Sequence, residues 1–239
     1  MHLSNFPTIE ELMTGVESEL HDVLDSRDMD LYRMMSYHLG WEDDRGQPQS
    51  SLVKPRSHGV ACLTACYAAG GDLKKALPAA AAVEMVSNFC QIHDDVQGGH
   101  PKRHGRDAVW WVWGPAQAIN AGDGMHALAR LSIFRLQERG VSSETTFRAV
   151  QLLDQASLKV CEGRFQDLEA QERIDLSVDD YLKMASGKTG ALYSCAIKLG
   201  AMIASAEESV VEALGECGAK SGMAVQIRDD LRELWPNDE

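Results

Sequence analysis

Positive charge is scarce in this sequence. Lysine and arginine together number 23 against 36 aspartates and glutamates, which leaves a formal net charge of −13. A nucleic-acid partner is therefore not expected, because contacts to a phosphate backbone need a basic surface. A small phosphorylated ligand remains compatible with this charge, since a few local cations or a divalent metal suffice to bind it.

Three further absences narrow the class of protein. No run of the sequence approaches the ~20 apolar residues of a membrane span, and the N-terminus lacks the positive-then-apolar pattern of a signal peptide. The six cysteines form no C-x-x-C pair, so we expect them to be reduced in a cytoplasmic protein. Hydrophobic residues make up 44% of the chain, which excludes a disordered composition.

Strand signals are weak and helical signals are strong. Segment 9–24 has apolar residues at spacings of three and four, and Thr8 before it is a candidate N-cap. The pattern also predicts a buried helix that stops at Gly70, a short helix that ends at Pro78, and a long helix over about 78–95. With the later segments, the sequence predicts one all-α bundle of roughly seven or eight helices over residues 1–239.

Three polar motifs stand out against these helices: "HDD" at 93–95, "GKTG" at 187–190 and "QIRDDLRE" at 226–233. Each acidic pair lies at the C-terminal end of a long apolar helix, where adjacent side chains point ~100° apart and can reach one cavity mouth. Carboxylates and phosphate oxygens are the ligands that Mg²⁺ prefers. Two facing pairs would suit a diphosphate held through metal ions, with Lys188 and Thr189 as further donors.

In this order the motifs resemble those of the trans-isoprenyl diphosphate synthases, or polyprenyl synthetases, a family related to the class I terpene synthases. The resemblance covers about residues 50 to 235 and rests on segments 69–96, 105–129, 188–201 and 225–234. It implies an isoprenoid synthase-type helical bundle around a deep central cavity, usually a homodimer. It also implies loss of diphosphate from an allylic prenyl diphosphate, assisted by roughly two or three Mg²⁺ ions.

The resemblance also implies roles for particular residues. The catalytic positions are Asp94, Asp95, Lys188, Asp229 and Asp230, and the metal ligands are Asp94, Asp95, Asp229, Asp230 and Glu233. The resemblance places Lys54, Arg103, Lys188, Thr189 and Gln226 at the substrate's diphosphate. We add two arginines as further diphosphate contacts: Arg56, which lies close to a family arginine place, and Arg164, which departs from the family pattern. Phe89, about 7.5 Å along the helix from Asp94, would with Cys90 limit the prenyl pocket to a chain of about C15–C20.

The first acidic motif departs from the family pattern. Its third carboxylate is replaced by Gly98, or by His100 in the longer spacing, and a histidine nitrogen is a poor Mg²⁺ ligand. A glutamine of the long central helix is replaced by Arg164, an always-charged side chain that makes forked contacts to phosphates. We therefore expect this motif to hold metal more weakly than the second.

The region expected to bind isopentenyl diphosphate departs further. The family's "GGKRxRP" reads "LVKPRSH" at 52–58, with Pro55 and Ser57 in the two arginine places. The chain ends at Glu239, soon after the second motif, so the single domain is expected to lack the family's C-terminal helices.

Three hypotheses follow from these departures. The favoured one is a terpene synthase-like enzyme that ionises one allylic diphosphate and has a degraded isopentenyl diphosphate site. The alternative is a chain-elongating, geranylgeranyl-type diphosphate synthase with variant motifs. The third is a non-catalytic partner subunit of a homologous synthase, which the missing acid at Gly98 and the Cys62-x-x-x-Cys66 pair leave open.

Overall fold

The computed structural model describes residues 6–49 and 55–235. Its helices are α1 (Ile9–Leu24), α2 (Asp30–Leu39), α3 (Ser57–Ala68), α4 (Leu73–Gln97), α5 (Val109–Trp113), α6 (Pro115–Phe134), α7 (Ser143–Ala170), α8 (Val178–Ala185), α9 (Ala191–Ile203) and α10 (Glu208–Leu234). A π-helical turn (Ser186–Gly190) joins α8 to α9, and β1 (Lys102–Arg103) pairs with β2 (Arg106–Asp107) as a short antiparallel hairpin. The predicted all-α fold is confirmed.

Local sequence signals set several of these helix ends. Thr8 caps α1, as predicted: its hydroxyl accepts from the Glu11 N–H, and the Glu11 carboxylate accepts from the Thr8 N–H. The apolar stripe of α1 is buried from Leu12 to Leu24. Helix α3 ends just before Gly70, whose positive φ of 79° suits a residue without a Cβ.

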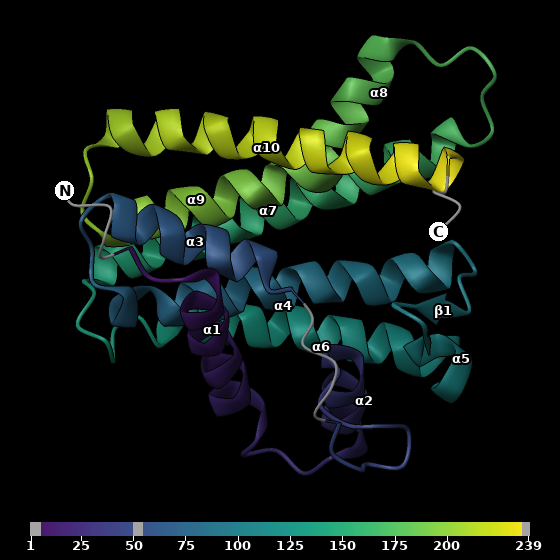
Figure 1. Cartoon of the computed structure of the whole chain (residues 1–239), viewed down its shortest axis with the longest axis horizontal. Coiled ribbons are helices and arrows are strands. Elements are labelled where there is room, and N and C mark those ends of the chain that lie inside the picture. Colours follow the sequence, from purple (N-terminus) through teal and green to yellow (C-terminus); the bar gives the residue numbers. More distant parts are fainter. Residues whose placement is uncertain (1–5, 50–54, 236–239) are drawn as a thin grey trace.

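Helix α4 crosses the middle of the bundle. It packs mainly on α6 and α3, while α9 packs on α3 and α10 (Figure 1). Helices α4 and α10 run in the same direction, so their C-terminal ends lie at the same end of the molecule, near the β1 hairpin (Figure 1). The packing therefore brings the ends of both acidic helices to one place, as the sequence indicated.

The predicted break at Pro78 is wrong, because α4 is one helix of 25 residues that continues through it. A proline in the interior removes one backbone hydrogen bond and costs about 3 kcal/mol. That cost is offset by burial, since Ala76 and Ala79–Ala82 are fully buried against neighbouring helices. The Pro78 carbonyl also accepts a hydrogen bond from the Ser132 hydroxyl of α6, at 2.9 Å.

None of the helices within the described ranges is both long and apolar enough to cross a bilayer.

Close contact between α7 and the π-helical turn depends on two glycines. A Cβ on Gly163 would overlap the backbone nitrogen of Lys188 and lie 2.9 Å from the Cα of Gly187. Backbone atoms cannot yield as a flexible side chain can, so this approach needs glycine. The contact sets the position of Lys188 beside the side chains that follow Gly163 on α7.

We predict that Gly163→Ala lowers the free energy of unfolding by about 1–3 kcal/mol, because the added methyl group overpacks a backbone contact. The matched control is Gly15→Ala in α1, where the new Cβ would meet only the flexible end of Leu77 at 3.2 Å. There the higher helix propensity of alanine should leave stability unchanged or raise it by up to about 1 kcal/mol. Urea unfolding followed by circular dichroism measures both, and equal stability of the two variants would contradict this account.

Candidate functional site

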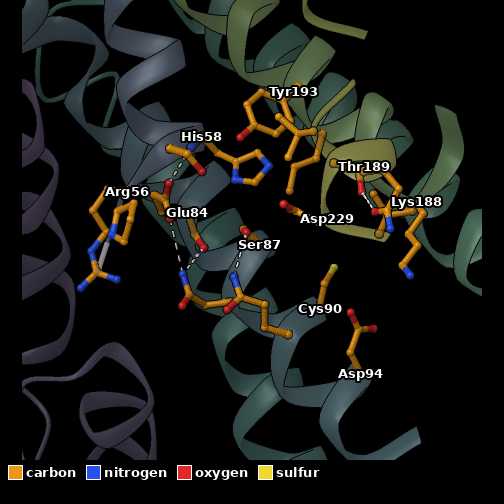
Figure 2. Close-up of a pocket in the computed structure, with 18 of the residues that line it drawn as sticks. Arg56, His58, Glu84, Ser87, Cys90, Asp94, Lys188, Thr189, Tyr193 and Asp229 are labelled. Atoms are coloured by element: carbon orange, nitrogen blue, oxygen red, sulfur yellow. Dashed lines mark hydrogen bonds between the residues drawn. The ribbon is translucent and has the colours of Figure 1, made fainter. Parts of the chain in front are cut away.

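A cavity of about 560 Å³ lies between α4 on one side and α9, α10 and the π-helical turn on the other. Its wall on α4 includes Ser87, Cys90 and Asp94, which are spaced three and four residues apart and so share one face of the helix (Figure 2). The opposite wall contributes Lys188 and Asp229 (Figure 2). The structure thus places the first aspartate of each acidic motif at one cavity, together with the lysine of the "GKTG" motif.

Both aspartates of the first motif form ion pairs with arginine. Arg164 of α7 contacts the Asp94 carboxylate through its Nη2 atom. Arg103 of β1 makes a forked contact to Asp95, with Nε 2.9 Å from both carboxylate oxygens and Nη2 2.8 Å from Oδ1. Asp95 is buried, so this pair is shielded from water and screened less than a surface pair.

The tight β1–β2 hairpin positions Arg103. The turn between the strands consists of His104 and Gly105, whose φ values are 50° and 76°. Two left-handed residues in succession are typical of a two-residue hairpin turn. This turn directs Arg103 back towards the end of α4, eight residues after the aspartate that it contacts.

A further carboxylate, not predicted from the sequence, contacts two of the cations that line the cavity. Asp167 accepts from Arg164 Nη1 at 3.0 Å and from Lys188 Nζ at 2.8 Å, through the same oxygen atom. Its position three residues after Arg164 on a helix was the available signal, because such residues share a face.

The second acidic motif has different partners. Asp229 lines the cavity with its side chain half exposed, and it pairs with the neighbouring Arg228 at 2.7 Å. Asp230 accepts hydrogen bonds from the Tyr181 hydroxyl at 2.6 Å and from the Gln226 amide at 2.7 Å. Burial and the Asp230 carboxylate raise the pKa of Tyr181, so this hydroxyl stays protonated and donates.

Gln226 also connects the second motif to the "GKTG" motif. The Thr189 hydroxyl donates to the Gln226 side-chain oxygen, and both residues line the cavity. Glu233, the predicted fifth metal ligand, is exposed at the end of α10 and is outside the cavity lining. The structure therefore gathers Lys188, Thr189, Gln226 and Asp229, but does not bring Glu233 to them.

Arg56 does not fit its predicted role in diphosphate binding. Its guanidinium is 2% exposed and makes a forked contact to Glu17, at 2.6 and 2.9 Å, and it donates to the Leu39 carbonyl at 3.0 Å. In Figure 2 this guanidinium points away from the cavity that the residue borders. Lys54, its predicted neighbour in that role, lies outside the described residues.

The two predicted pocket residues on α4 are separated in the structure. Cys90 lines the cavity, and burial raises the pKa of its thiol to about 12, so it presents a small neutral wall. Phe89 instead packs its ring against His93 and His126, with ring centroids 4.7 and 5.1 Å apart, and is outside the lining. The wall nearest the acidic end is therefore Cys90 rather than Phe89.

The far end of the cavity holds a buried polar group that the sequence reasoning missed. The Glu84 carboxylate accepts from the backbone N–H groups of His58 at 2.7 Å and Gly59 at 3.0 Å, which caps α3. Arg56 precedes α3 where a Ser, Thr, Asp or Asn would normally cap it, and that unusual residue was the available signal. Burial lowers the pKa of His58 to about 4, so its ring is neutral beside Tyr193.

The two acidic motifs differ in how well they fit a divalent metal. Mg²⁺ usually takes one or two carboxylates together with substrate phosphate oxygens and water, which the cavity-facing Asp229 allows. Asp94 and Asp95 are each already paired with an arginine, and Gly98 stands in the third position. Within the described ranges, no group of three or more histidine, cysteine, aspartate or glutamate side chains is arranged to hold a metal ion. Asp229 is also paired with an arginine, but the Arg228 contacts use only its Oδ1 atom and both side chains are half exposed. A metal therefore fits at Asp229 better than at the first motif.

Comparison with known proteins identifies the family of this chain. Residues 55–239 match the family model described as polyprenyl synthetase. The chain is 40% identical over 217 residues to a geranylgeranyl diphosphate synthase of Mycobacterium tuberculosis, covering 90% of this chain and 61% of that protein. The fold is that of the helical isoprenoid synthases, and the chain belongs to the polyprenyl synthetase family. It spans about three fifths of the length of this relative.

Solved structures show the same fold. A polyprenyl synthetase from Streptomyces coelicolor superposes with a TM-score of 0.87 at 33% identity, over 96% of this chain and 66% of that one. A polyprenyl synthase from Caulobacter crescentus, complexed with calcium and isoprenyl diphosphate, superposes with a TM-score of 0.78 at 28% identity. That alignment covers 92% of this chain and 62% of the Caulobacter chain.

We predict that Arg56→Gln lowers the free energy of unfolding by about 2–3 kcal/mol, because Glu17 loses its buried cation. Burial alone would raise the pKa of Glu17, but the hydrogen bonds and charge of Arg56 outweigh it and hold that pKa below its ordinary value of 4.5. The pair therefore stabilises the fold above that pH, and its contribution is lost as the pH falls through the lowered pKa.

Urea unfolding at pH 7 and at lower pH measures this effect, with Arg130→Gln as a control that removes an exposed ion pair to Asp154. The affinity of the folded Arg56→Gln protein for pyrophosphate should equal that of the wild type. If Arg56→Gln instead bound pyrophosphate ten times more weakly with unchanged stability, Arg56 would be a diphosphate contact after all.

Proposed function

We propose that this chain takes part in the elongation of prenyl diphosphates, in which an allylic prenyl group is transferred to isopentenyl diphosphate. The observation that carries the proposal is the single cavity lined by Asp94 and Asp229, with Lys188, Thr189 and Gln226 beside them. The relative from Mycobacterium tuberculosis is named as a geranylgeranyl diphosphate synthase, which favours the elongation hypothesis over the terpene synthase-like one.

In the proposed reaction, the bond between the allylic carbon and the diphosphate oxygen breaks, and its electron pair leaves with the diphosphate. The double bond of isopentenyl diphosphate supplies the electrons of the new carbon–carbon bond, and a proton is lost to restore a double bond. Cations fixed near the leaving diphosphate stabilise the charge that develops on it. We assign this role to Lys188, whose ammonium is held by Asp167 at 2.8 Å.

A divalent metal bound at Asp229 would supply further neutralisation of the leaving diphosphate. The related polyprenyl synthase from Caulobacter crescentus is complexed with both calcium and isoprenyl diphosphate, which supports the use of a divalent cation with this class of ligand.

The apolar part of the cavity is proposed to hold the prenyl chain. Cys90, Val160, Leu192 and Val225 line it behind the acidic mouth. Its volume of about 560 Å³ is within the ~300–1,000 Å³ range of small-molecule pockets. An apolar wall also keeps water from a carbocation formed at the mouth.

We also propose that the protein acts as a homodimer. Large apolar side chains are exposed on the adjacent helices α6 and α7: Ile119, Leu131 and Phe134 on the first, and Phe147, Leu158 and Phe165 on the second. Exposed apolar surface of this kind on neighbouring elements is typical of a protein interface.

A second candidate is the non-catalytic partner subunit, and one observation favours it. Both carboxylates of the first motif are paired with arginine, so they are less available to assist ionisation through metal. A subunit of this kind would bind a homologous synthase and alter the length of its product.

The deciding assay incubates the purified chain and Mg²⁺ with C10, C15 and C20 allylic diphosphates, with and without isopentenyl diphosphate. Mass spectrometry should show a longer prenyl diphosphate only when isopentenyl diphosphate is present, and none with the Asp229→Ala variant. Hydrocarbon or alcohol formed without it would contradict elongation and support a terpene synthase. The partner-subunit candidate would be supported if the chain by itself gave no turnover but altered the product of an active homologous synthase added to it.

Cys90 gives a separate prediction about product length. Cys90→Phe should shorten the longest product by about one isoprene unit, because the larger side chain fills the cavity behind Asp94. Cys217→Phe is the matched control, since Cys217 is exposed on α10 and lies outside the cavity lining. If both variants make products of wild-type length, the prenyl chain does not occupy this cavity.

A further inference from the structure

Asp94 is in contact with a cation supplied by the protein itself, the guanidinium of Arg164. Arg164 reaches across from α7 to the end of α4 and contacts Asp94 and Asp167 with its two terminal nitrogens. Its side chain is 17% exposed and lines the cavity. Arg103 holds Asp95 in the same way from the other side. Each carboxylate of the first motif therefore has a guanidinium in contact with it.

This arrangement competes directly with a metal at the same carboxylates. Mg²⁺ demands near-octahedral coordination at about 2.0–2.1 Å by oxygen, and a guanidinium in contact with the carboxylate occupies that space. Arginine cannot relieve the competition by losing its proton. The motif also has Gly98 at its third position, so no further acid is available there to raise its affinity for metal.

The same arginine is suited to a phosphate group. Guanidinium has five N–H donors in a rigid fork, and two carboxylate acceptors leave others for a ligand in the cavity. Lys188 shares the Asp167 oxygen with Arg164, so the two cations are held side by side at the mouth. Asp94 and Asp167 act here as positioning residues, because they hold the two cations in place.

We propose that arginine takes the place of magnesium at the first acidic motif, so that Arg164 contacts the substrate's diphosphate directly and a metal is needed only on the side of Asp229. The ligand class, a diphosphate, rests on the proposed function. The residue that distinguishes this chain is Arg164, and its replacement by glutamine restores the uncharged side chain found at that position in the family pattern.

Isothermal titration calorimetry with inorganic pyrophosphate tests this without any turnover. The wild-type protein should bind pyrophosphate in EDTA, and Arg164→Gln should weaken that metal-free binding by about tenfold or more, since it loses a charge-assisted contact. Adding Mg²⁺ should restore much of the affinity of Arg164→Gln, so its dependence on metal should exceed that of the wild type by a similar factor.

The control variant is Arg148→Gln, which makes the same chemical change on the same helix. Arg148 is half exposed and pairs with Glu208 at 2.7 Å, away from the cavity. Its affinity for pyrophosphate should match that of the wild type with and without metal. Arg164→Lys keeps the charge without the fork and should bind metal-free pyrophosphate with intermediate affinity. Circular dichroism melting confirms that each variant is folded. If one of the two Arg164 variants does not fold, the pyrophosphate affinity of the other still tests the proposal.

The outcomes separate the inference from the proposed function. If the wild type and both Arg164 variants bind pyrophosphate equally in EDTA, or if the wild type binds it only with Mg²⁺, the arginine substitution is overturned and the proposed function stands. If pyrophosphate binds under no condition, the proposed function fails and the inference fails with it.

Discussion

Five carboxylates gather at one end of the helical bundle, and their mutual repulsion must be offset for the helix ends to meet there. They are Asp94, Asp95, Asp167, Asp229 and Asp230. Each one contacts a donor from another part of the chain or from its own helix. The three on α4 and α7 are paired with arginine or lysine, whereas Asp230 on α10 is satisfied by neutral donors.

This distribution of partners divides the cavity mouth into two sides. On the α4 side, Arg164 and Arg103 supply fixed positive charge within the protein. On the α10 side, Asp229 is half exposed, and its partner Arg228 contacts only the Oδ1 atom, which leaves Oδ2 for a metal. A preorganised cation needs no metal to be recruited before a diphosphate binds, and this is the physical basis on which we propose that arginine serves in place of metal at the first motif.

Features that depend on local sequence were predictable. The cap at Thr8, the C-terminal positions of both acidic pairs on their helices and the place of "GKTG" follow from periodicity and end signals. Membership of the polyprenyl synthetase family was predictable too, because the motifs and their order carry it. The cap and the helix-end signals act within one helix or across one turn, and the motif order is read along the chain, so a single sequence contains all of them.

Features that depend on distant partners were not predictable. Arg56 resembled a diphosphate contact until the fold placed Glu17 against it, 39 residues earlier in the chain. The helix through Pro78 continues because surrounding helices bury its alanines, and Phe89 packs on His126 of another helix. In each case the packing of separate helices outweighs the local signal, and no spacing within the sequence encodes it.

The central claim is that a metal binds beside Asp229 and that arginine replaces metal beside Asp94. The most direct measurement is a crystal structure of the wild-type protein with Mn²⁺ and pyrophosphate, with the metals located by their anomalous scattering. The account predicts manganese within about 2.2 Å of an Asp229 oxygen, a pyrophosphate oxygen in contact with Arg164, and no metal bound to Asp94 or Asp95. Manganese coordinated by Asp94 or Asp95, with Arg164 displaced from the carboxylate, would contradict it.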